Sequence, residues 1–206
     1  TRTLLLLITL LFGASAQAAD EPTLDELLAH PEVQGSLAVI DAWIDGRKMY
    51  EQIPGVSVGI VHDQDLLWTS GYGVSNLETG RPADADTLYS ICSISKLFTA
   101  IGIRQLRDQE KLRLSDPVND HLPDDLRIPD SGSERPIRIA DLMRHTPGFE
   151  NAILGHALVR DPARVRPLHD YLRDFRPQRV RDPGDLISYS NYGAALAGYI
   201  VARVSG

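Results

Sequence analysis

The chain has 206 residues, of which 43% are hydrophobic and 24% are charged, and these proportions are ordinary for one globular domain with a substantial core. Its net charge of −7 argues against a broad surface that binds the phosphates of a nucleic acid. The single cysteine, Cys92, excludes an intrachain disulfide, and the six histidines lack the spacing of metal ligands. We therefore expect no metal and no other cofactor.

The first residues have the pattern of a cleaved export signal. Arg2 precedes an apolar run from Leu4 to Phe12, and small residues at Ala16 and Ala18 fit a cleavage site. The run is too short for a permanent membrane span, and the alternative interpretation is a buried core helix. We expect residues 1–18 to be a signal peptide, residues 19–206 to be the mature part of the chain, and the protein to be periplasmic or secreted.

Helix and hairpin patterns follow the signal. Residues 24–50 are predicted to be helical with a break at Pro31, and the helix ends before Pro54 and Gly55. Residues 56–61 predict a buried strand, residues 62–65 a turn, and residues 66–70 the returning strand of a hairpin.

A Ser-x-x-Lys pair, Ser93 and Lys96, stands where a loop is predicted to become a helix. Residues three apart on a helix are neighbours, so Lys96 is expected to lie beside Ser93. A serine hydroxyl is a weak nucleophile until a base removes its proton, and a desolvated lysine can be that base. The alternative is an ordinary helix with a capping serine and an exposed lysine.

The same helix carries an apolar pattern at i, i+3, i+4 and i+7, which predicts a buried face formed by Ile94, Leu97, Phe98 and Ile101. Cys92, next to Ser93, is interpreted as a small buried apolar residue.

Two segments separate this helix from the second chemical motif. Residues 137–143 predict another helix, which ends at Thr146 before Pro147 and Gly148. Residues 159–182 alternate arginines with aspartates, and a solvated helical face is favoured there over an anion-binding site.

The second motif is Tyr189-Ser190-Asn191, at the start of a predicted helix. A tyrosine can act as a general acid or base when nearby positive charge lowers its pKa. An asparagine offers a donor and an acceptor to a substrate amide. The alternative is a packed tyrosine followed by a helix-capping asparagine.

These motifs and their flanks, in this order, resemble the serine β-lactamase and penicillin-binding-protein superfamily, and within it the class C-like branch. The resemblance runs from about Pro54 to Gly206. It rests on Pro54-Gly55, on Ser93-Ile94-Ser95-Lys96, on Leu112-Arg113-Leu114-Ser115-Asp116-Pro117-Val118, on Leu142-Met143-Arg144-His145-Thr146-Pro147-Gly148-Phe149 and on Tyr189-Ser190-Asn191-Tyr192-Gly193.

The resemblance implies an α/β (α+β) fold of the β-lactamase/transpeptidase type, in which helices flank an antiparallel sheet and form a separate helical lobe. Ser93 would form an acyl-enzyme, Lys96 and Tyr189 would share the proton transfers, and Asn191 would bind the substrate and orient Lys96. Either Lys96 or Tyr189 could be the first base. His145 is expected to belong to a structural turn. The substrate would be a β-lactam, a D-amino-acid peptide or a small ester, and the oligomeric state is left open.

One motif of the superfamily, Lys or His followed by any residue and Gly, does not occur in these 206 residues. We therefore expect the chain to be the N-terminal part of a catalytic domain, truncated at its C-terminus, with only the first hairpin of the sheet and the helical part. This part alone is expected to be marginally stable and weakly active or inactive. Two alternatives are a non-catalytic member that binds peptidoglycan or another ligand, and an unrelated exported α/β protein.

Overall fold

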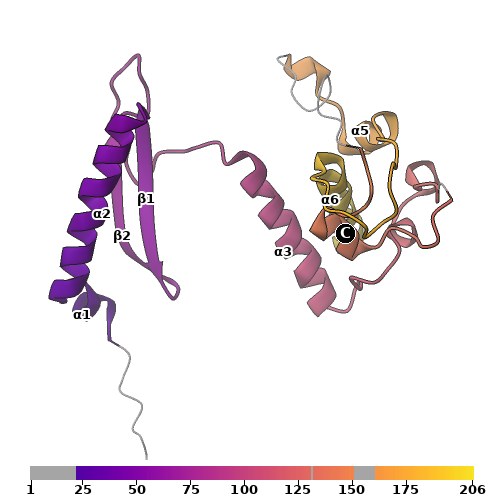
Figure 1. Cartoon of the computed structure of the whole chain (residues 1–206), viewed down its shortest axis with the longest axis horizontal. Coiled ribbons are helices and arrows are strands. Elements are labelled where there is room, and N and C mark those ends of the chain that lie inside the picture. Colours follow the sequence, from indigo (N-terminus) through magenta and orange to yellow (C-terminus); the bar gives the residue numbers. More distant parts are fainter. Residues whose placement is uncertain (1–21, 131, 151–160) are drawn as a thin grey trace, which may run out of the picture. The chain divides into compact units, whose positions relative to one another are not determined.

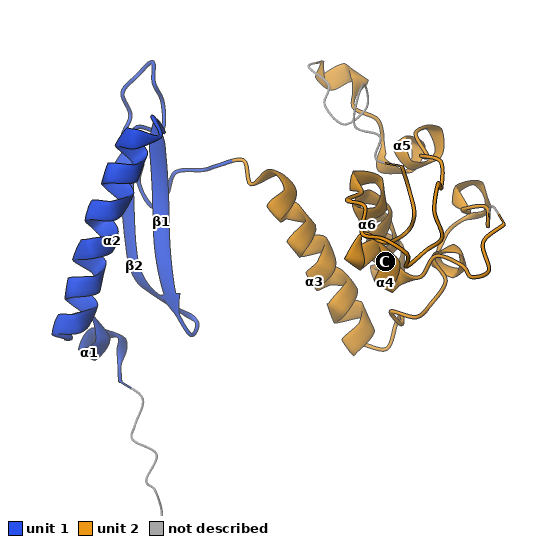
Figure 2. Ribbon diagram, in the orientation of Figure 1, with its two compact units in different colours: residues 1–89 blue, residues 90–206 orange. Residues whose placement is uncertain are grey.

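Two units make up the chain in the computed structural model, one of residues 1–89 and one of residues 90–206 (Figure 2). The structure describes residues 22–130, 132–150 and 161–206. The expected signal peptide, residues 1–18, lies outside the described residues. Each unit is described by itself.

The described part of the first unit begins with two helices, α1 and α2, that meet at a proline (Figure 1). Helix α1 (Leu24–Ala29) starts with a capping box between Thr23 and Glu26. Helix α2 (Pro31–Tyr50) starts at Pro31, whose fixed φ and missing N–H are tolerated at the first helical position. The break that the sequence predicts at Pro31 is therefore present.

A hairpin follows, formed by the antiparallel strands β1 (Gly55–His62) and β2 (Asp65–Gly73). It lies along α2 (Figure 1), to which it is joined by a hydrogen bond of 2.7 Å from the buried Tyr72 hydroxyl to Asp41 Oδ1. The expectation that the first strand is buried is wrong, because no residue of β1 is fully buried and Val61 is exposed. A two-stranded sheet with one helix beside it cannot cover both faces of its strands.

The second unit is helical around one hydrophobic core. Its main helices are α3 (Ser95–Asp108), α4 (Ile139–Arg144), α5 (Leu168–Asp174) and α6 (Asn191–Ser205). Helix α6 contacts the other three and contributes the fully buried Leu196 and Ile200 to the core. Short helical turns fill the connections, such as Val118–His121.

The apolar face predicted for α3 is not the face that the core covers. Exposed fractions of 44% to 65% are found for Ile94, Leu97, Phe98 and Ile101, whereas Ile103 and Leu106 are buried. This part of the prediction is wrong because the core of the 90–206 unit packs against the side of α3 that faces α6, where Gly102 lies close to Val201.

Helix α4 ends in a turn fixed by a buried carboxylate. Asp141 accepts hydrogen bonds from both terminal nitrogens of Arg135, at 2.8 and 2.9 Å, and from Thr146 Oγ1 at 3.2 Å. Burial alone raises the pKa of Asp141, but Arg135 and the Arg138 N–H outweigh it and hold that pKa below its usual value. This network fixes the residues that follow α4, including His145.

Among residues 22–130, 132–150 and 161–206, no helix is both long and apolar enough to cross a membrane. Nor do the described residues include three or more metal-binding side chains grouped around a common point.

Candidate active site

Ser93 lies in a single helical turn, Cys92–Ile94, that leads into α3. Lys96 follows in the first turn of α3, and its Nζ donates a hydrogen bond of 3.1 Å to Ser93 Oγ. Cys92 has a φ of 45°, which is uncommon outside glycine and marks a sharp turn just before the serine. The interpretation of Cys92 as a buried residue is wrong, because its thiol is exposed at this turn.

Tyr189 comes from a distant part of the sequence, 96 residues after Ser93. Its hydroxyl donates a hydrogen bond of 2.7 Å to Ser93 Oγ, and Lys96 Nζ lies 5.0 Å from the centre of its ring. One serine oxygen thus contacts both groups that the sequence singles out as proton carriers. The structure brings Ser93, Lys96 and Tyr189 together at the start of α3.

Electrostatics at this point favour loss of the tyrosine proton. Hydrogen bonding with Lys96, and then with Ser93, lowers the pKa of Tyr189 from its usual value near 10, because both interactions stabilise the phenolate. The tyrosine is 42% exposed, so water reaches this side of the site.

Tyr189 is held at the start of α6 by its two serine neighbours. The side chain of Ser190 caps α6 by accepting a hydrogen bond of 2.9 Å from the Gly193 N–H, and Ser190 is buried. The Ser188 N–H donates to the carbonyl oxygen of His145 at 2.7 Å. The backbone on both sides of the tyrosine is therefore anchored.

His145 was expected only in a structural turn, yet it contacts the tyrosine. The two ring centres are 4.6 Å apart with an angle of 34° between the ring planes. Burial, and then the charge of Lys96, lower the pKa of His145 below its usual value, so its imidazole is neutral at pH 7. No spacing in the sequence relates His145 to Tyr189, and only the Thr-Pro-Gly turn after it marks the position.

Asn191, the expected substrate-binding residue, is the first residue of α6 and is half-buried. In the part of the chain that the structure describes, its side chain forms no hydrogen bond with Ser93, Lys96 or Tyr189. Asn191 is therefore close to Tyr189 in sequence, but the contacts described above connect only Ser93, Lys96 and Tyr189.

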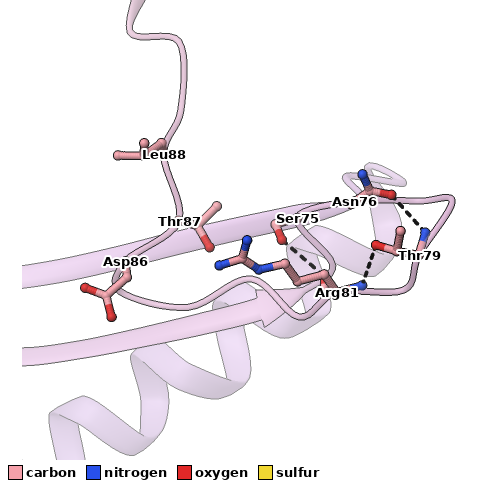
Figure 3. A pocket seen from close by; sticks show the side chains of 7 residues that line it. All are labelled: Ser75, Asn76, Thr79, Arg81, Asp86, Thr87 and Leu88. Atoms are coloured by element: carbon pink, nitrogen blue, oxygen red, sulfur yellow. Dashed lines mark hydrogen bonds between the residues drawn. The ribbon is translucent and has the colours of Figure 1, made fainter.

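Two pockets are lined by residues other than Ser93, Lys96 and Tyr189. The first, an open pocket of about 540 Å³ in the 1–89 unit, is lined by polar side chains such as Asn76, Arg81 and Asp86 (Figure 3). Asn76 Oδ1 is already engaged by the Thr79 N–H within the turn. The second, about 340 Å³, lies between Phe149, Arg176 and Arg179 in the 90–206 unit. Ser75 and Arg81 both line the first pocket, but Ser75 Oγ donates to the backbone carbonyl oxygens of Arg81 and Pro82 and not to a basic side chain.

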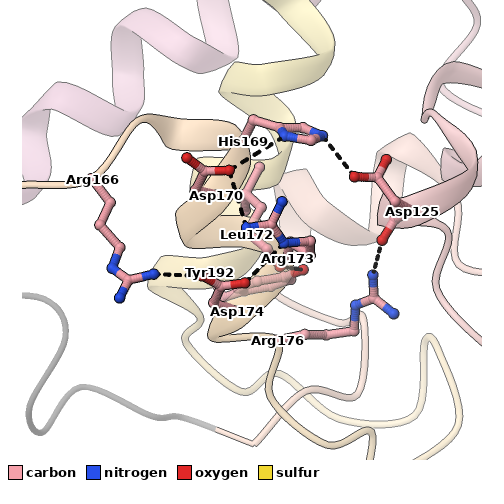
Figure 4. Close-up of polar contacts among 9 residues, drawn as sticks. All are labelled: Asp125, Arg166, His169, Asp170, Leu172, Arg173, Asp174, Arg176 and Tyr192. Atoms are coloured by element: carbon pink, nitrogen blue, oxygen red, sulfur yellow. Dashed lines mark hydrogen bonds and ion pairs between the residues drawn. The ribbon is translucent and has the colours of Figure 1, made fainter.

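Two of the described arginines after residue 159, Arg166 and Arg173, pair with aspartates of the same stretch. Arg173 bridges Asp170 and Asp174 on α5, and Arg166 pairs with Asp174 from outside the helix (Figure 4). The helix covers only Leu168–Asp174 within the described residues 161–182, so the solvated face is shorter than the sequence suggests. The predicted residues 159 and 160 lie outside the described residues.

Proteins of known sequence are similar to most of this chain. Relatives include Protein flp of Staphylococcus aureus strain MW2, 29% identical over 167 residues, and a β-lactamase of Providencia stuartii, 32% identical over 165 residues. These alignments cover 81% and 80% of this chain but only 33% and 40% of the relatives, so the chain spans well under half of their length.

Solved structures give the same result for the fold. The octameric penicillin-binding protein homologue from Pyrococcus abyssi has a TM-score of 0.68 and 27% identity, and the match covers 82% of this chain and 39% of that one. The class C β-lactamase from Rhodobacter sphaeroides has a TM-score of 0.59 and 31% identity, and covers 81% and 44%. The fold is therefore β-lactamase/transpeptidase-like.

The fold and these relatives define the serine hydrolase class that contains the serine β-lactamases and penicillin-binding proteins. Within it, the family model described as Beta-lactamase matches residues 40–206, and the chain belongs to this family. The match begins earlier than the resemblance seen in the sequence, which starts near Pro54, and so includes part of α2.

Proposed function

We propose that the protein is a serine hydrolase in which Ser93 forms an acyl-enzyme with a β-lactam, a D-amino-acid peptide or a small ester. The observation that supports this most strongly is the double contact of Ser93 Oγ, with Lys96 Nζ at 3.1 Å and the Tyr189 hydroxyl at 2.7 Å. A capping serine needs neither contact. Both groups donate to Oγ in the structure, and either of them, once deprotonated, lies at the distance from which it could accept the serine proton.

In the proposed reaction, Ser93 Oγ attacks the substrate carbonyl carbon and its proton passes to the neighbouring base. The lowered pKa of Tyr189 supports the phenolate as that base, with Lys96 stabilising its negative charge. The new bond joins Oγ to the carbonyl carbon, the C–N or C–O bond breaks, and the proton goes to the leaving group. The Ser93 N–H donates to the oxyanion, and Asn191 binds the substrate amide.

Covalent labelling tests the proposal. Penicillin adds to Ser93 by ring opening, and a fluorophosphonate adds with loss of fluoride, so both leave a mass increase on the tryptic peptide that contains Ser93. We expect labelling of the wild-type protein, tested both as this chain and in a chain that extends past Gly206, and none in Ser93→Ala. Labelling that persists in Ser93→Ala would contradict the proposal.

A non-catalytic member of the family is the second candidate, favoured by the absence of a Lys-x-Gly or His-x-Gly triplet from these 206 residues. It predicts saturable, reversible binding of penicillin or a peptidoglycan peptide without any covalent adduct in either chain length. The same absence supports weak turnover by the 206-residue chain, because an oxyanion donor is expected near that triplet. Rapid turnover of an ester or a β-lactam by this chain would contradict that expectation.

Export is part of the proposal and rests on residues 1–18, with Arg2, the apolar run and the small residues before Ala19. We expect the mature protein to begin at Ala19 and to be recovered from the periplasm or the medium. N-terminal sequencing of the recovered protein measures this, and a retained Arg2 in the exported protein would contradict it.

A further inference from the structure

His145 contacts the segment around Tyr189 at three points. Its carbonyl oxygen accepts the Ser188 N–H at 2.7 Å, its Nδ1 accepts the Ser190 N–H at 3.2 Å, and its ring lies 4.6 Å from the ring of Tyr189. The N–H groups of both chain neighbours of Tyr189 therefore donate to His145, one to its carbonyl oxygen and one to its imidazole, and the imidazole lies against the tyrosine ring.

The histidine is itself rigidly placed. It ends α4 in the left-handed conformation, with φ 57° and ψ 38°, and its N–H donates to the Leu142 carbonyl. Leu142 is buried in the core, and the next residue, Thr146, is bound to the buried Asp141. A left-handed non-glycine residue is uncommon, so this conformation is maintained by the structure around it.

We propose that His145 is a positioning residue that holds the Tyr189 hydroxyl against Ser93, and that it does so with its neutral imidazole. The consequence for the reaction rests on the proposed function, whereas the positioning itself rests on these contacts. The Ser190 N–H needs a hydrogen-bond acceptor, and only an unprotonated Nδ1 of His145 can be one. Protonation would turn Nδ1 into a second donor that faces this N–H, so the hydrogen bond would be lost.

The charges around His145 act in the same direction. Lys96 faces it from α3, and its positive charge disfavours the imidazolium. Arg144 precedes it on α4. The nearby carboxylate of Asp141 is occupied by Arg135 and Thr146, so it is not available to stabilise a proton on the imidazole. His145 is therefore expected to stay neutral until the pH falls below about 6.5, its ordinary pKa.

Two substitutions separate the acceptor from the backbone conformation. Asparagine and glycine both tolerate the left-handed region, but only asparagine offers an oxygen close to the position of Nδ1. His145→Asn keeps the acceptor and removes the titrating ring, whereas His145→Gly removes both. His62→Asn, on the exposed end of the hairpin, is the matched control, and urea unfolding checks that each variant is folded.

The first measurement is the pKa of the Tyr189 phenol, followed by ¹³C NMR of tyrosine-labelled chain and assigned with Tyr189→Phe. We expect the lowered value in the wild type to persist in His145→Asn and His62→Asn. In His145→Gly it should return to the ordinary value near 10, because the phenol leaves Lys96 and Ser93. An unchanged value in a folded His145→Gly would overturn the proposal.

The second measurement is the rate at which a fluorophosphonate labels Ser93. We expect His145→Gly to be slower than wild type by at least about tenfold, with most of the rate restored in His145→Asn. The ratio of the wild-type rate to the His145→Asn rate should fall once the pH is below about 6.5 and low enough to protonate the imidazole, and this ratio cancels the titration of the other groups. A ratio that stays constant down to the pH at which the protein unfolds, or equal rates in the Asn and Gly variants, would overturn the proposal. If wild type is not labelled at all, the proposed function fails, and the phenol pKa alone then decides the role of His145.

Discussion

At the scale of single residues, the site depends on one serine oxygen that accepts hydrogen bonds from an amine and a phenol. Lys96 reaches Ser93 through local helix geometry, because three residues along a helix bring side chains together. Tyr189 reaches it only through the packing of α6 against the rest of the unit. The first contact is predictable from the sequence spacing, whereas the second requires the fold or a known family resemblance.

Tyr189→Phe tests the phenol separately from the ring. The substitution keeps the ring beside His145 and removes the hydroxyl that lies 2.7 Å from Ser93, so the acid or base is lost without a change in packing. We expect the rate of fluorophosphonate labelling to fall about a hundredfold or more. Tyr50→Phe, at an exposed position of α2, is the control and should label at the wild-type rate. Equal rates in the two variants would exclude a role for the phenol.

Asp141 gives a prediction about stability and pH. Its pKa is lowered in the folded protein, so the stability that the carboxylate contributes is present above its ordinary pKa of about 3.9 and disappears as the pH falls through the lower, folded value. Asp141→Asn, which weakens the two bonds to Arg135, should cost about 2 kcal/mol of unfolding free energy at pH 7.

Urea unfolding at pH 7 and near pH 3 measures this effect. The difference between wild type and Asp141→Asn should shrink at the lower pH, because the Asp141 carboxylate of the unfolded wild-type chain takes up a proton below its ordinary pKa of about 3.9. Asp108→Asn is the control, since Asp108 pairs with Arg107 on the exposed end of α3 and its removal should cost little. If the difference in unfolding free energy between wild type and Asp141→Asn were the same at both pH values, the charge of Asp141 would not be the cause of the destabilisation.

At the scale of elements, the sequence predicts what local chemistry decides. The break at Pro31 follows from the missing N–H of proline, and the hairpin follows from two apolar runs around a polar turn. The buried side of α3 was missed because both sides of this helix carry apolar residues. Periodicity finds an apolar side, but only the position of α6 decides that Ile103 and Leu106 are buried in this unit and that Phe98 is not.

Two glycines at the contact between α3 and α6 test this packing. A Cβ on Gly102 would lie 3.0 Å from a methyl carbon of Val201, whereas a Cβ on Gly198 would meet Thr99 only at 3.7 Å, an ordinary contact. Alanine favours a helix over glycine by about 1 kcal/mol. We expect Gly198→Ala to raise the unfolding free energy by roughly that amount. In Gly102→Ala, the close contact with Val201 should cancel this increase.

Urea midpoints of the two alanine variants provide the measurement. The prediction concerns their difference, with Gly198→Ala the more stable by about 1 kcal/mol. Equal stabilisation by both substitutions would mean that α3 and α6 are further apart at Gly102 than the structure indicates.

At the scale of the whole chain, the two units differ in how much apolar surface they bury. In the described part of the 1–89 unit the buried hydrophobic residues are Leu37, Tyr72 and Ala83. The core of the 90–206 unit combines residues from α3, α4, α5 and α6. A two-stranded hairpin is marginally stable in water without further strands or a covering layer. The hairpin is therefore expected to open more readily than the helical unit.

Hydrogen exchange on the intact 206-residue chain measures this directly, without cutting the units apart. Amides paired between β1 and β2, such as those of Val58 and Ser70, should exchange at least about a hundredfold faster than the core amides of α6 around Leu196. The reason is that opening the hairpin exposes little apolar surface, whereas opening α6 exposes side chains packed against three other helices. Val58→Thr should raise hairpin exchange further and leave α6 unchanged, because the two units have separate cores. Equal protection in β1 and α6 would mean that the hairpin belongs to the same cooperative unit as the helices, and the expectation of a marginal first unit would then be wrong.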